Sequence, residues 1–136
     1  MEKSMKVLLV VPFLLAAITL SFKDVDQNAD WKVPEANAKM ENPVEVDDEI
    51  LAIGKSLYTK HCKSCHGNEG LGDGSKADEF DDFPGDFTSK EFQGQTDGAL
   101  FYKLTEGRNE MPEFSKKIPE EEDRWILVHY MRKLGE

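Results

Sequence analysis

Two cysteines and a histidine stand close together in the segment Cys62-Lys63-Ser64-Cys65-His66, and the chain of 136 residues has no other cysteine. Two thiols at this spacing can reach the two vinyl groups on one edge of a porphyrin. The histidine that follows then lies under the ring, where its imidazole can bind iron. The spacing therefore predicts one covalently attached haem c, with thioether bonds to Cys62 and Cys65 and with His66 as an axial ligand of the iron.

Three other uses of these residues are weaker. A disulfide is the ordinary fate of two cysteines in an exported protein, but a two-residue gap closes a very small, strained loop. Thiol–disulfide exchange usually occurs in a βαβ context, and the sequence has none. A zinc site lacks a fourth ligand at a credible spacing. The adjacent His66 favours haem over a disulfide.

The second axial ligand has several candidates among the remaining histidines and methionines. His61 is next to Cys62 and is tied to the same edge of the macrocycle, so it cannot reach the opposite face of the ring. His129 and Met131 fall within a predicted helix, where we expect His129 to lie at the surface. Met40 lies in a polar segment ahead of the predicted domain.

Met111 differs from these candidates because it is in a loop, 45 residues after His66 and directly before Pro112. The proline disfavours helical backbone at the residue before it, so the methionine is held extended. A lone methionine often serves only to fill a core. The loop position favours ligation, and the sequence predicts His66 and Met111 as the two axial ligands of the haem iron.

The elements that must position these residues are predicted to be helices. Asp47 can cap a helix that runs into the cysteine motif, with an apolar stripe that includes Gly54 and Tyr58. A second helix fits residues 96–106, with Thr96 as its cap and Gly107 as its end. A third begins at Pro119, and acidic residues follow in its first turn.

The stretches between these helices are predicted to be loops. Residues 67–74 contain four glycines, and the acidic and aromatic run of residues 78–86 is interpreted as solvated carboxylates with inward-facing phenylalanines. A metal site within that run is the weaker interpretation. No stretch shows sustained strand alternation. The predicted fold class is all-α, with long loops and a thin core that one haem would complete.

Residues 1–22 carry Lys3 and Lys6 ahead of an apolar run of 16 residues, Val7–Phe22. This run is shorter than the roughly 20 residues that span a bilayer, so it predicts a signal peptide, with an uncleaved anchor as the alternative. Residues 23–46 are predicted to be a polar tether, and residues 47–136 the domain. The sequence leaves open whether Trp31 holds the tether against the domain or is exposed.

The chain has a formal net charge of −10. Residues 1–22 contribute only Glu2, Lys3 and Lys6, so the rest has 26 acidic and 15 basic residues and a charge near −11. Nucleic acid is excluded as a partner, because phosphate binding needs a basic face. An acidic surface instead favours docking on a basic patch of a redox partner, although plain solubility explains the charge equally well.

Four features in one order carry a family resemblance. Gly54-x-x-x-Tyr58 precedes Cys62-x-x-Cys65-His66, and a Met111-Pro112 loop and a terminal helix with Leu127-x-x-Tyr130 follow. Over about residues 48–135 they resemble class I monohaem cytochrome c, and within it the small bacterial, oxidase-associated members. The resemblance implies the cytochrome c fold, in which helices pack around one haem and the terminal helices cross near Gly54 and Tyr130.

The resemblance further implies that a proline carbonyl after the haem motif accepts a hydrogen bond from the axial imidazole, and Pro84 is the best match. It implies an electron carrier rather than an enzyme, exported to the periplasm or anchored to the outer face of the cytoplasmic membrane through residues 7–22. The expected partners are redox proteins, such as a quinol-oxidising complex and a terminal oxidase or reductase. The alternative function is a haem enzyme or small-ligand sensor with an open sixth position, for which only Arg108 is near enough in sequence to act.

Overall fold

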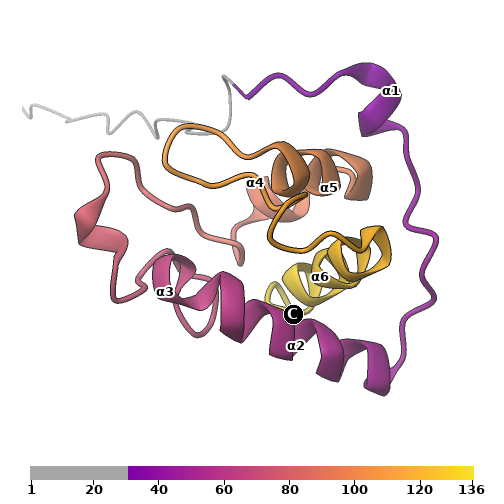
Figure 1. The fold of residues 1–136 in the computed structure, drawn as a ribbon, viewed down its shortest axis with the longest axis horizontal. Coiled ribbons are helices and arrows are strands. Elements are labelled where there is room, and N and C mark those ends of the chain that lie inside the picture. The colour runs from indigo at the N-terminus through magenta and orange to yellow at the C-terminus, as the bar shows by residue number, and fades with distance from the viewer. Residues whose placement is uncertain (1–30) are drawn as a thin grey trace, which may run out of the picture.

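Helix α2 (Asp48–His61) packs against helix α6 (Glu121–Lys133) in the computed structural model, which describes residues 31–136 (Figure 1). The other helical elements are α1 (Glu35–Ala38), α3 (Lys63–His66), the 3-10 helix η1 (Ala77–Glu79), α4 (Lys90–Gln93) and α5 (Asp97–Glu106). No strand occurs over residues 31–136, so the predicted all-α fold class is confirmed. The predicted signal peptide or anchor, residues 1–22, lies outside the described residues.

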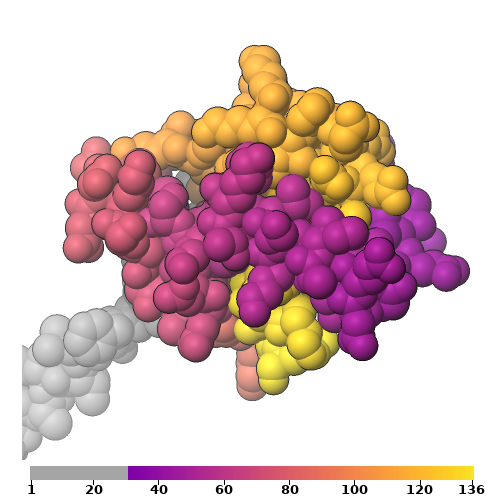
Figure 2. Space-filling model, turned by 60° about the horizontal axis from the view of Figure 1, so that its bottom comes forward, coloured from indigo at the N-terminus to yellow at the C-terminus, as the bar shows by residue number. Residues whose placement is uncertain are grey.

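Helix α2 begins where the sequence predicted. The side chain of Asp47 accepts a hydrogen bond from the backbone N–H of Ile50 (2.8 Å), which satisfies one of the free donors at the helix start. The helix then crosses α6 at Gly54, where an added Cβ would lie 2.9 Å from the Cβ of Tyr130 and 3.1 Å from the carbonyl oxygen of Ile126. Figure 2 shows α2 lying across the surface of the molecule over this crossing. The predicted contact between the terminal helices near Gly54 and Tyr130 is therefore present.

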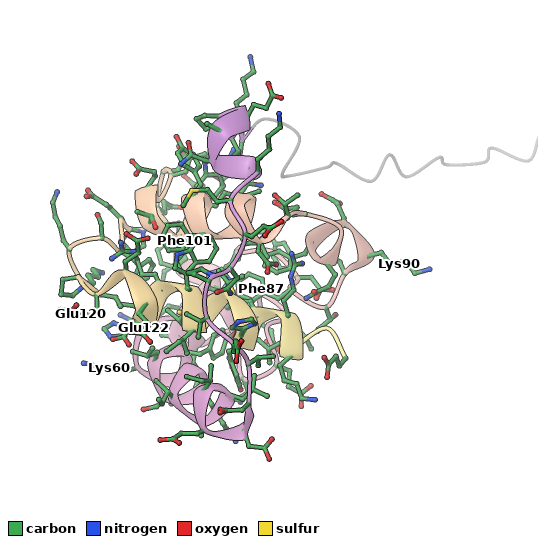
Figure 3. All side chains as sticks on the ribbon, turned by 90° about the vertical axis from the view of Figure 1, so that its right-hand side faces the viewer. Lys60, Phe87, Lys90, Phe101, Glu120 and Glu122 are labelled. Atoms are coloured by element: carbon green, nitrogen blue, oxygen red, sulfur yellow. The ribbon has the colours of Figure 1, made fainter. Side chains whose placement is uncertain are left out.

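Helices α5 and α6 supply most of the apolar interior. Thr96 caps α5 through a bond from the N–H of Ala99 (3.2 Å), and the helix ends before Gly107, as predicted. The rings of Phe101 in α5 and Trp125 in α6 stack with centroids 3.8 Å apart. Figure 3 shows Phe101 and Phe87 inside the molecule, while labelled lysine and glutamate side chains project outward.

The start of α6 differs from the prediction. Pro119 was expected to be its first residue, but the helix begins at Glu121 with Glu120 as its N-cap. The buried guanidinium of Arg124 explains the shift, because it binds the carbonyl oxygens of Ile118 (2.6 Å) and Pro119 (3.0 Å). These bonds hold Ile118 and Pro119 outside the helix, ahead of its N-cap residue Glu120.

The described part of the predicted tether, residues 31–46, lies against the domain. Its short helix α1 packs on α5, where an added Cβ at Gly98 would lie 2.7 Å from the carbonyl oxygen of Met40. The hydroxyl of Thr96 donates to the carbonyl of Ala38 (2.7 Å), and the side-chain amide of Asn42 donates to the carbonyl of Trp125 (3.1 Å). Hydrogen bonds to residues far along the chain therefore hold this segment in place, although its composition alone predicts irregular structure.

His129 also belongs to this contact. Its Nε2 atom lies 2.7 Å from the carbonyl oxygen of Val44, and its side chain is partly buried. The expectation that His129 lies at the surface was wrong, because the N-terminal segment covers that side of α6. Within residues 31–136, none of the helices has the length and apolar character needed to span a bilayer.

Candidate functional site

The cysteine motif forms the joint between two helices. Cys62 ends α2, and the one-turn helix α3 carries the next four residues to His66. The N–H groups of Cys65 and His66 both donate to the carbonyl of Cys62, at 3.1 and 3.0 Å. Both cysteines therefore stand on one helical turn, and His66 follows in the same turn, as the predicted attachment geometry requires.

The glycine-rich loop folds back on this turn. Backbone N–H groups of Gly72, Gly74 and Lys76 donate to motif carbonyls, those of His66 (3.0 Å), Cys65 (3.1 Å) and Ser64 (2.8 Å) respectively. An added Cβ at Gly74 would lie 2.5 Å from the carbonyl carbon of Cys65, so only glycine allows the two backbones to come this close. The loop thereby fixes the backbone from which the cysteines and the histidine project.

His66 is held as a neutral imidazole. Burial lowers its pKa from 6.5 to about 4, because the protonated ring would lose its hydration. The Nδ1 atom is buried without a hydrogen-bond partner, and the ring packs on Phe87 with centroids 4.4 Å apart. A neutral imidazole is the form that binds a metal, so His66 can act as an iron ligand over the whole physiological pH range.

Both thiols of the motif are free. Cys62 is buried, and its burial together with the nearby Cys65 thiol raises its pKa to about 12. Cys65 is half-buried, with its sulfur 3.7 Å from the Ser64 hydroxyl oxygen. Cys62 therefore faces the apolar interior, while Cys65 lies nearer the surface.

Pro84 was predicted to orient the axial imidazole through its carbonyl. In the described residues, no group accepts a hydrogen bond from Nδ1 of His66, so the structure does not join the two residues. The segment after Pro84 instead brings Phe87 against the imidazole, fixed by a bond from the Phe87 N–H to the carbonyl of Gly70 (2.7 Å). The role of Pro84 stays a prediction.

Met111 closes a tight turn that begins at Arg108. The N–H of Arg108 donates to the carbonyl of Met111 (3.0 Å), and the N–H of Met111 donates back to the carbonyl of Arg108 (2.9 Å). Asn109, at the second position, has a φ of 52°, which asparagine tolerates better than most residues. Met111 is half-buried and packs against the apolar cluster that contains Cys62 and Phe87. The predicted sixth ligand therefore stands in a defined turn beside the same cluster as the haem motif.

The tip of this turn is bonded to the acidic run, a contact that sequence reasoning missed. The carboxylate of Glu110 accepts hydrogen bonds from the backbone N–H groups of Asp81 (3.0 Å) and Asp82 (3.4 Å). The side-chain amide of Asn109 donates to the carboxylate of Asp82 (3.0 Å). The acidic run is thus more than a solvated face, because part of it holds the Met111 turn across a gap of 28 or 29 residues in sequence.

The other candidates for the sixth ligand have different surroundings. The ring of His61 meets Phe114 edge-on, with centroids 6.3 Å apart. His129 lies against the N-terminal segment, Met131 is buried in the core, and Met40 is exposed. Of the five candidates, Met131 belongs to the hydrophobic core cluster that includes Cys62, and Met111 packs against that cluster; Met131 lies within α6, whereas Met111 stands in a turn between helices.

No group of three or more histidine, cysteine or acidic residues in residues 31–136 is placed to hold a metal ion.

The phenylalanines in and next to the acidic run differ in burial. Phe87, directly after the run, is buried as expected, but Phe83 within the run is 49% exposed and lies over Gly72. The expectation that all the phenylalanines face inward was wrong for Phe83, because the glycine beneath it belongs to a surface loop.

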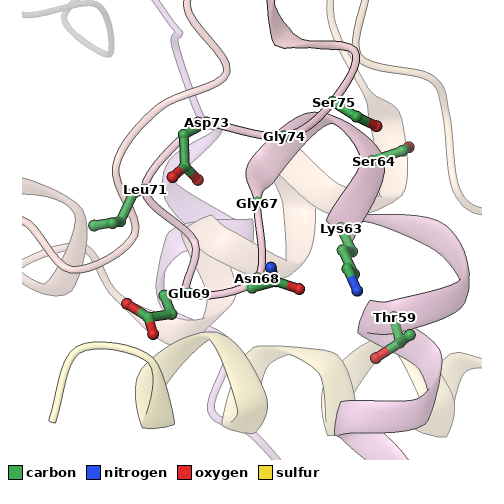
Figure 4. Close-up of a pocket in the computed structure, with 10 residues that line it drawn as sticks. All are labelled: Thr59, Lys63, Ser64, Gly67, Asn68, Glu69, Leu71, Asp73, Gly74 and Ser75. Carbon is green, nitrogen blue, oxygen red and sulfur yellow. The ribbon is translucent and has the colours of Figure 1, made fainter.

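An open hollow of about 670 Å³ lies between the outer side of the motif and the glycine-rich loop (Figure 4). Polar and charged side chains line it, among them Lys63, Asn68 and Asp73. None of the predicted haem-binding residues is part of this lining. The hollow is a feature of the outer surface of the motif.

The sequence model of one protein family, described as Cytochrome C oxidase, cbb3-type, subunit III, matches residues 49–131. The chain belongs to this family. The matched range runs from α2 into α6 and includes the cysteine motif, the glycine-rich loop and the Met111 turn. The predicted membership among the monohaem c-type cytochromes is confirmed.

Two solved structures resemble the chain as well. A chain of the Kuenenia stuttgartiensis reducing HAO-like protein complex Kustc0457/Kustc0458 is 33% identical with a TM-score of 0.62, over 69% of this chain and 47% of that one. The KustC0563 c-type cytochrome is 28% identical with a TM-score of 0.53, over 61% of this chain and 98% of that one. The chain thus spans about half of the first structure and nearly all of the second. No curated protein matches the chain.

A cytochrome of this family binds haem c covalently, and the described residues fit that group. The two thiols of the motif are free, and burial keeps the imidazole of His66 neutral, the form that binds a metal. The predicted cofactor, one covalent haem c, is confirmed by the family, and Cys62 and Cys65 stand at the spacing that its attachment needs.

We expect Glu110→Ala to loosen the Met111 turn from the acidic run. Hydrogen bonds to a charged acceptor contribute about 1.5 kcal/mol, so exchange of the Asp81 and Asp82 amide protons should accelerate roughly tenfold. Hydrogen-exchange NMR measures both amides directly. Glu106→Ala, which removes an exposed carboxylate at the end of α5, is the matched control, and equal exchange in the two variants would show that Glu110 holds nothing.

Proposed function

We propose that this cytochrome is an electron carrier in which His66 and Met111 are the two axial ligands of its haem iron. The observation that carries the proposal is the placement of Met111. It stands in a turn bonded at its tip to the acidic run and packs against the apolar cluster that contains Cys62. When bound, haem c supplies an iron that changes by one electron between Fe(II) and Fe(III).

The chain's own residues set the conditions for that change. His66 donates a neutral nitrogen, and the thioether of Met111 favours Fe(II), which raises the potential above that of a bis-histidine site. Apolar side chains around Cys62 exclude water and disfavour the additional positive charge of the oxidised state. With both axial positions occupied by side chains, no position remains for a substrate.

The placement of Arg108 supports a carrier over an enzyme or a small-ligand sensor. An open sixth position would need a polar side chain beside it, and Arg108 is the candidate near enough in sequence. Its guanidinium carbon instead lies 4.6 Å from the ring centroid of Trp31. One of the similar structures is a chain of an HAO-like complex. A second setting for this domain is therefore an enzyme complex in which it transfers electrons.

The partners we propose are redox proteins with a basic docking face. The chain's charge of −10 would speed encounter with such a face and make the rate sensitive to salt. A quinol-oxidising complex as donor and a terminal oxidase or reductase as acceptor fit this role, and the oxidase subunit in the family's description supports the acceptor side. The site of action would be outside the cytoplasm, in the periplasm or at the outer face of the membrane through residues 7–22.

Visible spectra of the purified holoprotein in both oxidation states test the proposal. We expect low-spin iron in each state, no rapid binding of carbon monoxide to the reduced protein, and haem that remains attached after acid–acetone extraction. High-spin reduced iron that binds carbon monoxide at once would support the enzyme or sensor instead. Mass spectrometry of the same sample gives the haem count and the mature N-terminus.

A further inference from the structure

The N-terminal segment contacts the Met111 turn through Trp31. This half-buried indole has two cations near its ring, with Arg108 Cζ at 4.6 Å and Lys103 Nζ at 5.4 Å from the centroid. Both distances are within the range of a cation–π interaction. The aromatic ring therefore joins a segment ahead of the domain to the last turn of α5 and to the first residue of the Met111 turn.

The two residues that carry these cations, Lys103 and Arg108, are linked to the Met111 turn through backbone hydrogen bonds. The carbonyl of Lys103 accepts the N–H of Gly107 (3.0 Å) at the end of α5, directly before Arg108. Arg108 in turn exchanges both of its backbone hydrogen bonds with Met111. A side chain that fixes Arg108 thus acts on Met111 through one pair of backbone bonds.

Trp31 is itself anchored rather than carried on a loose end. Downstream of it, the segment is bonded to the domain at Ala38, Asn42 and Val44. Lys103 is a buried residue, and its ammonium donates to the side-chain oxygen of Gln95 (2.6 Å), which fixes one cation beside the ring. The indole is therefore held in place by the bonds of its own segment, and it contacts a cation that is itself held in place.

We propose that Trp31 is a positioning residue for Met111, so that the N-terminal segment sets how firmly the thioether is held at the iron. This inference rests on the proposed His66/Met111 ligation. The tip of the turn is held by the acidic run and its base by Trp31. Loss of the aromatic ring frees the base, and the turn then opens more often.

Cyanide binding to the oxidised holoprotein measures this opening, because the ion must displace the sixth ligand. The apparent dissociation constant is inversely proportional to the fraction of open molecules, so a larger open fraction means tighter apparent binding of cyanide. Trp31→Leu keeps apolar bulk but removes the aromatic face, and it should raise the affinity roughly tenfold, as expected for a partly buried cation–π contact. Trp31→Phe, which keeps an aromatic face, should stay within about threefold of the wild type.

Hydrogen exchange at the Met111 amide is a second readout that does not depend on cyanide, and Trp31→Leu should accelerate it while Trp31→Phe does not. Wild-type behaviour of Trp31→Leu in both measurements, or equal effects of the two variants, overturns the proposal. Met111→Ala in the same cyanide assay tests the proposed ligation separately from the role of Trp31. If it changes the affinity while Trp31→Leu does not, only the role of Trp31 fails, and if it changes nothing, the proposed ligation itself fails.

Discussion

Met111→Ala should keep the covalent haem and lower the reduction potential by on the order of 100 mV or more. Axial-ligand identity is a main reason why haem potentials spread over about 0.8 V, and a thioether favours the reduced iron. A shift of 100 mV corresponds to about 2.3 kcal/mol for one electron. A spectroelectrochemical titration of wild type and variant measures the shift, and the mass of each protein shows that haem is still attached.

The surroundings of Met111 make this variant informative. The turn is held by backbone bonds between Arg108 and Met111 and by the carboxylate of Glu110, none of which involves the thioether. Truncation therefore removes the sulfur while the turn keeps its bonds. Met40→Ala, in an exposed methionine of the N-terminal segment, is the matched control. A potential unchanged in Met111→Ala, together with exclusion of carbon monoxide, would mean that another residue is the sixth ligand.

Met111→His sharpens the same experiment. An imidazole at this position should keep the iron low-spin in both states yet lower the potential, because the site then resembles bis-histidine ligation. The alanine variant should instead become accessible to small ligands. Similar potentials for wild type and the histidine variant would contradict ligation by the thioether.

The parts of the structure that the sequence predicted well are those encoded locally. Asp47 indicates a helix start, because its side chain caps the helix by accepting a hydrogen bond from the backbone N–H three residues ahead. The Cys62–His66 turn is likewise contained within five residues. Gly54 and Tyr130 were placed together through the family resemblance, since neither has a local signal that names the other.

The contacts that were missed join segments far apart in the chain. Val44 and His129 are 85 residues apart, and Asp81 and Glu110 are 29 apart. In each of these pairs a backbone group bonds to a polar side chain, so composition and periodicity give no sign of the contact. Exposure of such residues is the default expectation, and only packing of the whole domain reveals which ones are bonded.

The crossing of α2 and α6 gives the second large prediction, because Gly54→Val should destabilise the holoprotein by about 3 kcal/mol or more. Without a neighbour, replacing glycine in mid-helix by valine would be slightly favourable, since glycine is the poorer helix former. The sign of the change therefore reports the clash alone. The nearest atoms are the Cβ of Tyr130 and the backbone carbonyl oxygen of Ile126, so no change of rotamer relieves it.

Thermal and denaturant unfolding of the variant measure the loss, and about 3 kcal/mol lowers the midpoint by more than about 10 °C for a domain of this size. Ala52→Val, at an exposed position of α2, is the control and should cost only about 0.5 kcal/mol. Because α2 continues through Cys62 into α3, helices forced apart at Gly54 also shift the motif relative to α6. Equal stability of the two variants would mean that the helices cross elsewhere, whereas a Gly54→Val protein that is both unstable and spectrally altered would link this crossing to the haem site.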